Sequence, residues 1–117
     1  IPAPDSRRLR IAEATGKQIV KVIEQDLRPS QIITRPAFEN AIRVLHAISG
    51  SANAILHLLA YAGRVGVDLP LQLFDDLCAS TPWLVDLKPA GRFLMEDFFY
   101  AGGVPAVASI PNQVTTS

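Results

Sequence analysis

Apolar residues recur at helical spacing along most of the chain, and this pattern predicts an all-α fold of about five short helices. The first helix is predicted to begin at Asp5 or Ser6, either of which can cap it, and to end before Pro29. Its apolar stripe is Leu9, Ala12, Gly16, Ile19, Val20, Ile23 and Leu27. Glycine inside a helix costs about 1 kcal/mol relative to alanine. Gly16 therefore predicts the close approach of another backbone.

The second helix is predicted to follow a connector at residues 31–33, which is expected to be extended or a minor strand. Thr34 can cap this helix, and Pro36 falls in its first turn, where a missing N–H is tolerated. Its buried stripe is Phe38, Ala41, Ile42, Leu45 and Ile48. Ser49 and Gly50 end it, because glycine readily adopts a left-handed turn.

The chain is organised around the next helix, which begins with small and hydroxyl residues and continues as an almost wholly apolar run. Ser51 or Asn53 can cap it, and residues 54–62 are apolar on nearly every side, which is typical of a buried helix. The run is too short to span a bilayer, which needs roughly 20 residues. The free N–H groups at its start can attract a carboxylate or phosphate.

The remaining helices are shorter. Gly63 and Gly66 bracket the end of the central helix, and Asp68 is expected to cap an amphipathic helix through Leu71, Phe74 and Leu77. A turn is predicted at residues 88–91 and a last helix at residues 92–101. Its inward positions are predicted to be Phe93, Leu94, Phe98 and Ala101.

Residues 104–110 are expected to add one helical turn, and residues 112–117 are polar and expected to fray. The chain of 117 residues suits one modest domain, and eleven basic residues balance eleven acidic ones. This balance argues against a nucleic-acid-binding surface, which needs a clustered basic excess. Because the chain begins at Ile1 and is very apolar, we expect it to be processed or part of a longer protein.

Few residues carry candidate chemistry. Ser51 and Asn53 either cap the central helix or hold a substrate carboxylate. His57 lies one turn after Asn53, so it is either an acid, base or donor on that face or a satisfied core residue. His46 lies on the preceding helix and need not lie near His57. The single cysteine, Cys78, excludes an intrachain disulfide, cannot alone hold an iron–sulfur cluster or zinc, and is expected to be buried.

Two pairs of neighbouring acids, Glu96 with Asp97 and Asp75 with Asp76, are expected to be surface residues. Adjacent residues on a helix point about 100° apart, so neither pair is suited to one shared site. No phosphate-binding glycine loop, H-E-x-x-H motif or serine elbow is present in the sequence.

Four segments, in order and spacing, resemble the dihydroxy-acid dehydratase and phosphogluconate dehydratase family. They are T-R-P-A-F-E-N-A-I at residues 34–42, S-G-S-A-N-A-I-L-H-L-L-A at 49–60, L-K-P-A-G-R-F-L-M at 87–95 and A-G-G-V-P-A-V at 101–107. The family's usual G-G-S-T-N has Ser49 and Ala52 as departures here, so one hydroxyl is gained and one lost. The opening I-P-A-P-D-S and the M-E-D-F passage resemble the sugar-acid dehydratases more than the branched-chain enzyme.

The resemblance implies a cytoplasmic, homo-oligomeric hydro-lyase that dehydrates a 2,3-dihydroxy carboxylic acid, such as a sugar acid, to the 2-oxo acid. It implies an iron–sulfur cluster and Mg²⁺ in the intact protein, with ligands in segments absent here and none bound by this segment alone. Ser51, Asn53 and His57 are then substrate contacts or support residues, and none is assigned a catalytic role. No nucleic acid or membrane is expected as a partner.

On this interpretation, residues 1–110 are a helical segment of a larger α/β amino-terminal domain, and residues 111–117 are an unmatched polar tail. The segment alone is expected to be inactive and to pack against the remainder of the dehydratase chain. One alternative is a non-catalytic helical module that binds a partner protein through its apolar faces. Another is a truncated product that folds poorly.

Overall fold

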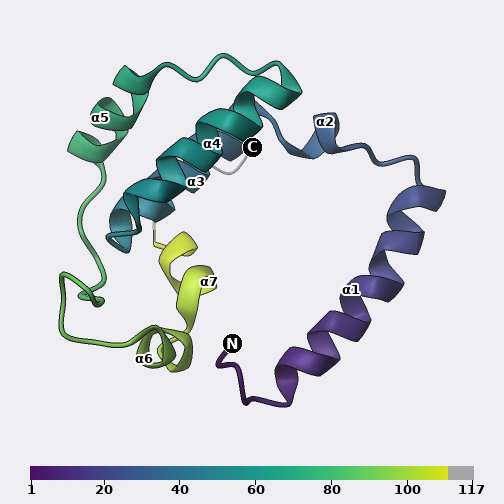
Figure 1. The fold of residues 1–117 in the computed structure, drawn as a ribbon, viewed down its shortest axis with the longest axis horizontal. Coiled ribbons are helices and arrows are strands. Elements are labelled where there is room, and N and C mark those ends of the chain that lie inside the picture. The colour runs from purple at the N-terminus through teal and green to yellow at the C-terminus, as the bar shows by residue number, and fades with distance from the viewer. Residues whose placement is uncertain (111–117) are drawn as a thin grey trace.

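The computed structural model describes residues 1–110, and within them the chain is all helical, as predicted. Figure 1 shows the order of the elements. The helices are α1 (Arg7–Glu24), α2 (Pro29–Ile32), α3 (Arg35–Ala47), α4 (Ala52–Val65), α5 (Leu71–Ser80), α6 (Met95–Tyr100) and α7 (Gly103–Ala108). The described residues form no strand, only an isolated bridge between Leu87 and Phe93. The predicted polar tail at 111–117 lies outside the described residues.

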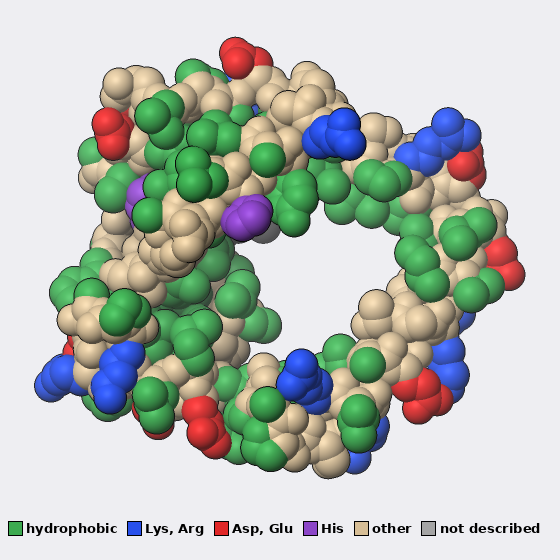
Figure 2. Space-filling view, in the orientation of Figure 1, with side chains coloured by type: hydrophobic (Ala, Val, Ile, Leu, Met, Phe, Trp, Pro, Cys, Tyr) green, Lys and Arg blue, Asp and Glu red, His purple; other side chains and the backbone are tan. Residues whose placement is uncertain are grey.

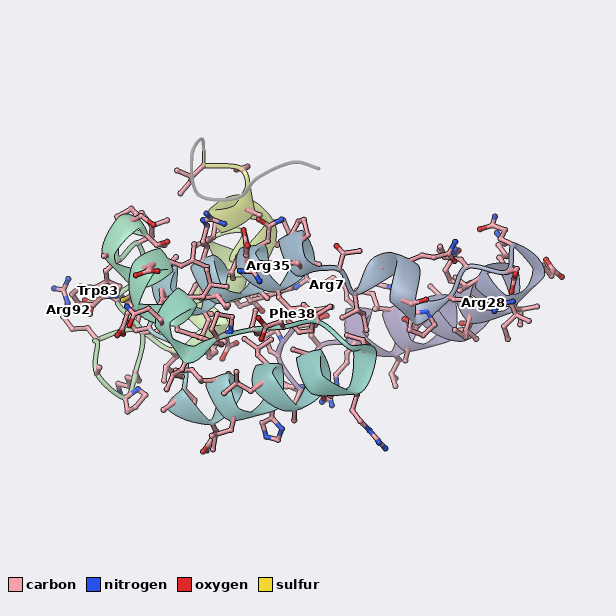
Figure 3. All side chains as sticks on the ribbon, turned by 90° about the horizontal axis from the view of Figure 1, so that it is seen from above. Arg7, Arg28, Arg35, Phe38, Trp83 and Arg92 are labelled. Carbon is pink, nitrogen blue, oxygen red and sulfur yellow. The ribbon has the colours of Figure 1, made fainter. Side chains whose placement is uncertain are left out.

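The chain divides into an arm, which is α1 and α2, and a body, which runs from α3 to α7. In Figure 1 the arm lies apart from the body and closes a ring with it, because the N-terminus comes near α6. Figure 3 shows the same division from above, with Phe38 inside the body and Arg28 at the far end of the arm. The predicted helical turn near the carboxyl end is confirmed as α7.

Two apolar clusters hold the body together. The first joins α3, α4 and α5 and consists of Phe38, Ile42, Ala62, Leu69, Phe74 and Leu77. Ile42 is fully buried at its centre. The second cluster consists of Ala47, Leu87, Phe98 and Val107. The Ala47 carbonyl oxygen also accepts hydrogen bonds from the backbone N–H groups of Leu84, at 2.9 Å, and Val85, at 3.1 Å.

The arm has an apolar stripe but buries none of it. The start of α1 after Ser6 agrees with the prediction, but the helix ends at Glu24, before the predicted stripe residue Leu27, and Asp26 has a positive φ of 50°. None of its residues is buried, and Leu9 and Ile23 are 76% and 71% exposed. The predicted approach of a backbone at Gly16 is wrong for the described chain, because no atom lies within 4 Å of a Cβ built there. The periodicity identified a helix correctly, but it carries no information on whether a partner is present.

The central helix α4 is less buried than predicted. Ala62 is its one buried residue, while Leu56 is 66% exposed and Leu58 and Leu59 are half-buried. The reason is that α4 packs mainly against α3 and the first apolar cluster, while its outer side, which carries Leu56, is exposed. Within the described part of the chain, α3 holds the central position instead.

One predicted connector and one predicted helix start are wrong. Residues 29–32 form α2 and not an extended connector, because Pro29 begins a helical turn and the Gln31 side-chain oxygen accepts from the Arg28 N–H at 2.7 Å. Asp68 does not cap α5, whose N-cap is Pro70. The Asp68 carbonyl oxygen instead accepts from Arg35 Nη1 at 2.9 Å.

The last predicted helix is shorter than expected, and three of its four inward positions are wrong. Phe93 and Leu94 are about half exposed, at 49% and 51%, and Ala101 is exposed, whereas Phe98 is buried. The helix begins after Leu94 because the Asp97 carboxylate accepts from the Leu94 N–H at 2.8 Å. Cys78 is exposed and not buried, since Phe74 and Leu77 occupy the inward side of α5.

Candidate functional site

The turn between α3 and α4 is built by three small residues. Ser49 adopts the left-handed conformation predicted for Gly50, with φ of 53°. Gly50 leaves no free space for a side chain, because a Cβ there would overlap Leu45 Cδ1 unless the Leu45 side chain moved. Its N–H donates to the Leu45 carbonyl oxygen at 2.8 Å and closes the end of α3.

Ser51 caps α4, as predicted. Its Oγ accepts a hydrogen bond from the Asn53 N–H at 3.2 Å. A hydroxyl that accepts one bond can still donate its own proton. The Ser51 O–H therefore remains able to donate to a ligand while the cap is in place.

This turn faces a second loop across a cleft of about 540 Å³. One wall is residues 48–52, and the other is residues 87–90 together with Met95. Both walls carry segments that resemble the dehydratase family, although they lie about 40 positions apart in the sequence. The Leu87 side of the cleft is fixed by the second apolar cluster, which also contains Val107 of a further matched segment.

The charge of the cleft favours an anion. Lys88 and two serines line it, and no acidic side chain is among the described residues that do so. The cleft also lies at the amino end of α4, a helix of 14 residues whose dipole places partial positive charge there. Lys88 is the residue that sequence reasoning missed, although it lies in a quoted motif, because the motif alone did not show that the two segments meet.

The structure separates the three predicted site residues. Ser51 lines the cleft, whereas His57 lines a different, larger groove of about 730 Å³ between α3, α4 and α7. All three residues, Ser51, Asn53 and His57, are exposed. The interpretation of His57 as a satisfied core residue is therefore wrong for the described chain.

The other candidate groups lie outside the cleft. His46 is on α3, and its buried Nε2 has no hydrogen-bond partner among the described protein atoms. Asp75, Asp76, Glu96 and Asp97 are exposed, as predicted. Asp97 nevertheless has a structural role that the sequence reasoning missed, since it begins α6.

A strong ion pair lies at the start of the arm. Asp5 accepts from the Arg7 backbone N–H at 2.8 Å and from Arg7 Nε at 3.0 Å. These hydrogen bonds lower the pKa of Asp5 from 3.8 to about 2 and raise the pKa of Arg7. The Arg7 guanidinium carbon also lies 4.9 Å from the centre of the Phe99 ring. The pair therefore fastens the arm to α6 and takes no part in the cleft.

The described residues do not fit the metal groups that the resemblance implies. No three His, Cys, Asp or Glu side chains gather within residues 1–110 to hold a metal ion. Cys78 is the single cysteine of the chain, whereas an iron–sulfur cluster is held by several thiolates. We therefore derive no chemical step through a cluster or Mg²⁺ from these residues. Within the same range, no helix is long and apolar enough to cross a bilayer.

Comparison with known proteins gives the same family. Residues 1–113 match the family model described as dihydroxy-acid/6-phosphogluconate dehydratase N-terminal. The chain is 55% identical over 107 residues to an L-arabinonate dehydratase of Rhizobium leguminosarum bv. trifolii, which covers 92% of this chain and 18% of the relative. It is 54% identical over 107 residues to an L-arabonate dehydratase of Azospirillum brasilense, with the same coverage of both chains.

A dihydroxy-acid dehydratase of Ignicoccus hospitalis is 47% identical over 107 residues, which are 92% of this chain and 19% of the relative. The chain thus spans less than a fifth of the length of the curated relatives it matches.

Proposed function

Because the chain belongs to the dihydroxy-acid/6-phosphogluconate dehydratase family, we propose that it is a section of a hydro-lyase that dehydrates a sugar acid. The substrate class is supported by the identity of 55% to a relative named L-arabinonate dehydratase, against 47% and 51% to two relatives named dihydroxy-acid dehydratase. In this reaction water leaves a 2,3-dihydroxy carboxylic acid, and the enol product becomes the 2-oxo acid.

The observation that carries the proposal is the cleft between residues 48–52 and 87–90. Two matched segments meet there, and a third supplies Val107 to the cluster beneath it. We assign the cleft to the substrate carboxylate, with Ser51 donating its hydroxyl and Lys88 supplying positive charge. We assign Asn53 and His57 to support of α4 and not to the carboxylate, because neither lines this cleft and His57 lines a different groove.

The remainder of the polypeptide completes the proposal. It would supply the ligands for the iron–sulfur cluster and Mg²⁺, because the described residues do not provide them. When bound, such metal groups make a hydroxide a better leaving group. A cytoplasmic homo-oligomer is part of the same proposal and rests on family membership. The 117 residues alone are expected to have no dehydratase activity.

The test uses the intact polypeptide that contains these residues, purified without oxygen. It should dehydrate L-arabinonate faster than a branched-chain 2,3-dihydroxy acid, as measured by 2-oxo acid formation. Turnover of neither acid would contradict the proposal, and turnover of the branched acid alone would reassign the substrate class. Ser51→Ala and Lys88→Met should each raise KM more than they lower kcat, whereas the matched change Lys21→Met on the arm should alter neither.

The exposed apolar face of α1 favours one second candidate, a non-catalytic helical module that binds a partner chain. The reading frame on both sides of these residues distinguishes the two. Cysteines with cluster spacing in the flanking sequence would favour the dehydratase, and their absence in both directions would favour the module.

A further inference from the structure

The ring of arm and body encloses an opening that passes through the molecule. Figure 2 shows this opening in the space-filling view, with hydrophobic side chains at several points of its rim, on the arm as well as on the body. The arm is held at both ends. Arg7 lies 4.9 Å from the Phe99 ring centre and 5.9 Å from that of Tyr100, and α2 continues directly into α3.

Both sides of the ring carry apolar grooves. On α1 a groove of about 450 Å³ is lined by Ile11, Ala14, Thr15, Gln18, Ile19 and Val22. The groove of about 730 Å³ on the body is lined by Val44, Leu45, Ile48, Leu58, Tyr61 and Val104, among others. Five charged residues of α1 lie away from this groove by helical spacing, at Arg10, Glu13, Lys17, Lys21 and Glu24, whereas Arg7 and Arg8 lie on the groove side at the start of the helix. The part of an occupant that contacts the two grooves is therefore expected to be mostly apolar.

The chain is more open than a compact monomer of its size. The accessible surface is 8307 Å², whereas a compact monomer of 12.7 kDa has roughly 6200 Å². The radius of gyration is 15.8 Å, against about 13 Å for a compact chain of this length. Apolar side chains that a compact monomer would bury are therefore left uncovered on both sides of the ring.

We infer that one apolar helix from the remainder of the dehydratase polypeptide occupies the opening and contacts α1 on one side and the α3–α4–α7 groove on the other. This inference rests on the proposed function, because the chain spans only 18% of its relative and leaves most of that polypeptide available. A second copy fits less well. In a second copy α1 is already joined to the body at both ends. That copy could therefore contact the outside of this molecule more easily than insert a helix into its opening.

The test is the rate of maleimide labelling at single introduced cysteines, read peptide by peptide so that Cys78 and other cysteines do not interfere. Ile19→Cys and Tyr61→Cys report on the two grooves, and Lys21→Cys and Asp75→Cys are exposed controls on the same or a neighbouring helix. In the 117-residue chain all four should label at similar rates. In the intact polypeptide the labelling rates of Ile19→Cys and Tyr61→Cys should fall by about tenfold or more, while both controls still label fast.

Equal labelling of grooves and controls in the intact polypeptide would overturn the inference. Protection of the 117-residue chain that grows with its own concentration would also overturn it, because it would assign the grooves to a second copy. If a cysteine variant does not fold, hydrogen exchange of the unmodified polypeptide over residues 11–22 gives the same information. Labelling needs no turnover, so an inactive enzyme with protected grooves would count against the proposed substrate and not against the docked helix.

Discussion

The arm and the body both contain amphipathic helices, but only the body buries the apolar side of its helices. Both α1 and α3 are amphipathic helices that are preceded by a capping residue type, Ser6 or Thr34. Yet α3 buries Phe38, Ile42 and Ala47, whereas α1 buries nothing. An amphipathic pattern thus predicts a helix, and only the structure shows whether the apolar side of that helix is covered.

The largest expected effect compares core truncation in the two regions. Phe38→Ala should lower the free energy of unfolding by about 3–5 kcal/mol, because Phe38 is 3% exposed in the first cluster. Ile23→Ala in the arm should change it by less than about 0.5 kcal/mol, because Ile23 already contacts water. Urea denaturation of the 117-residue chain measures both. A similar loss from the two variants would show that the arm is packed.

Glycine substitutions should have opposite signs in the two regions. Gly66 ends α4 with φ of 72°, so Gly66→Ala should lower stability by about 1–2 kcal/mol. Gly16 lies inside α1 with open space around it, so Gly16→Ala should raise the stability of that helix by about 0.5–1 kcal/mol. Thermal melts followed by circular dichroism report both changes. In the intact polypeptide, destabilisation by Gly16→Ala would place a close neighbour at this position.

Serine precedes both α4 and α1, and replacing it by alanine should lower stability at only one of the two helices. Ser51→Ala should lower stability by about 1 kcal/mol, because the Ser51 side chain accepts from the Asn53 N–H. Ser6→Ala should have almost no effect, since the Ser6 side chain forms no capping bond to α1. Equal losses in chemical denaturation would mean that Ser6 also caps its helix.

The smallest effect concerns the pair that fastens the arm to the body. Hydrogen bonds from Arg7 lower the pKa of Asp5 from 3.8 to about 2. A lowered carboxyl pKa stabilises the folded state above the unfolded pKa, so this contribution is present above pH 4 and is lost as the pH falls towards 2. NMR titration of the Asp5 carboxyl carbon should give a midpoint near 2. A midpoint near 3.8 would mean that the ion pair does not form.

The sequence predicted the helices better than their surroundings. The start of α1, the cap at Ser51 and the helical stripe through Phe38 and Ile42 follow from local rules of spacing and capping. The position of Asp68 could not be predicted, because its carbonyl oxygen accepts a hydrogen bond from Arg35 on a helix that is distant in sequence. The exposure of Leu56 could not be predicted either, because periodicity does not show which neighbours are present.

The candidate site was predicted in part. The cap at Ser51 followed from its position before an apolar helix, and the expectation of an anion rests on the helix dipole. Lys88 could not be found in this way, since it reaches the cleft only because the second cluster holds Leu87 against Ala47. The prediction that Ser51 and His57 share a site was based on helical spacing. Spacing shows which side of a helix a residue lies on, but it does not show that the two residues line separate grooves.

The central claim is that the arm lacks its partner in this segment and gains it in the complete polypeptide. Amide hydrogen exchange of α1, compared between the 117-residue chain and the intact polypeptide, tests this claim most directly. We expect the amides of α1 to exchange much faster than those of α3 in the segment, and at rates close to those of α3 in the intact polypeptide. Slow exchange of α1 in the segment itself, or fast exchange in both, would contradict the account.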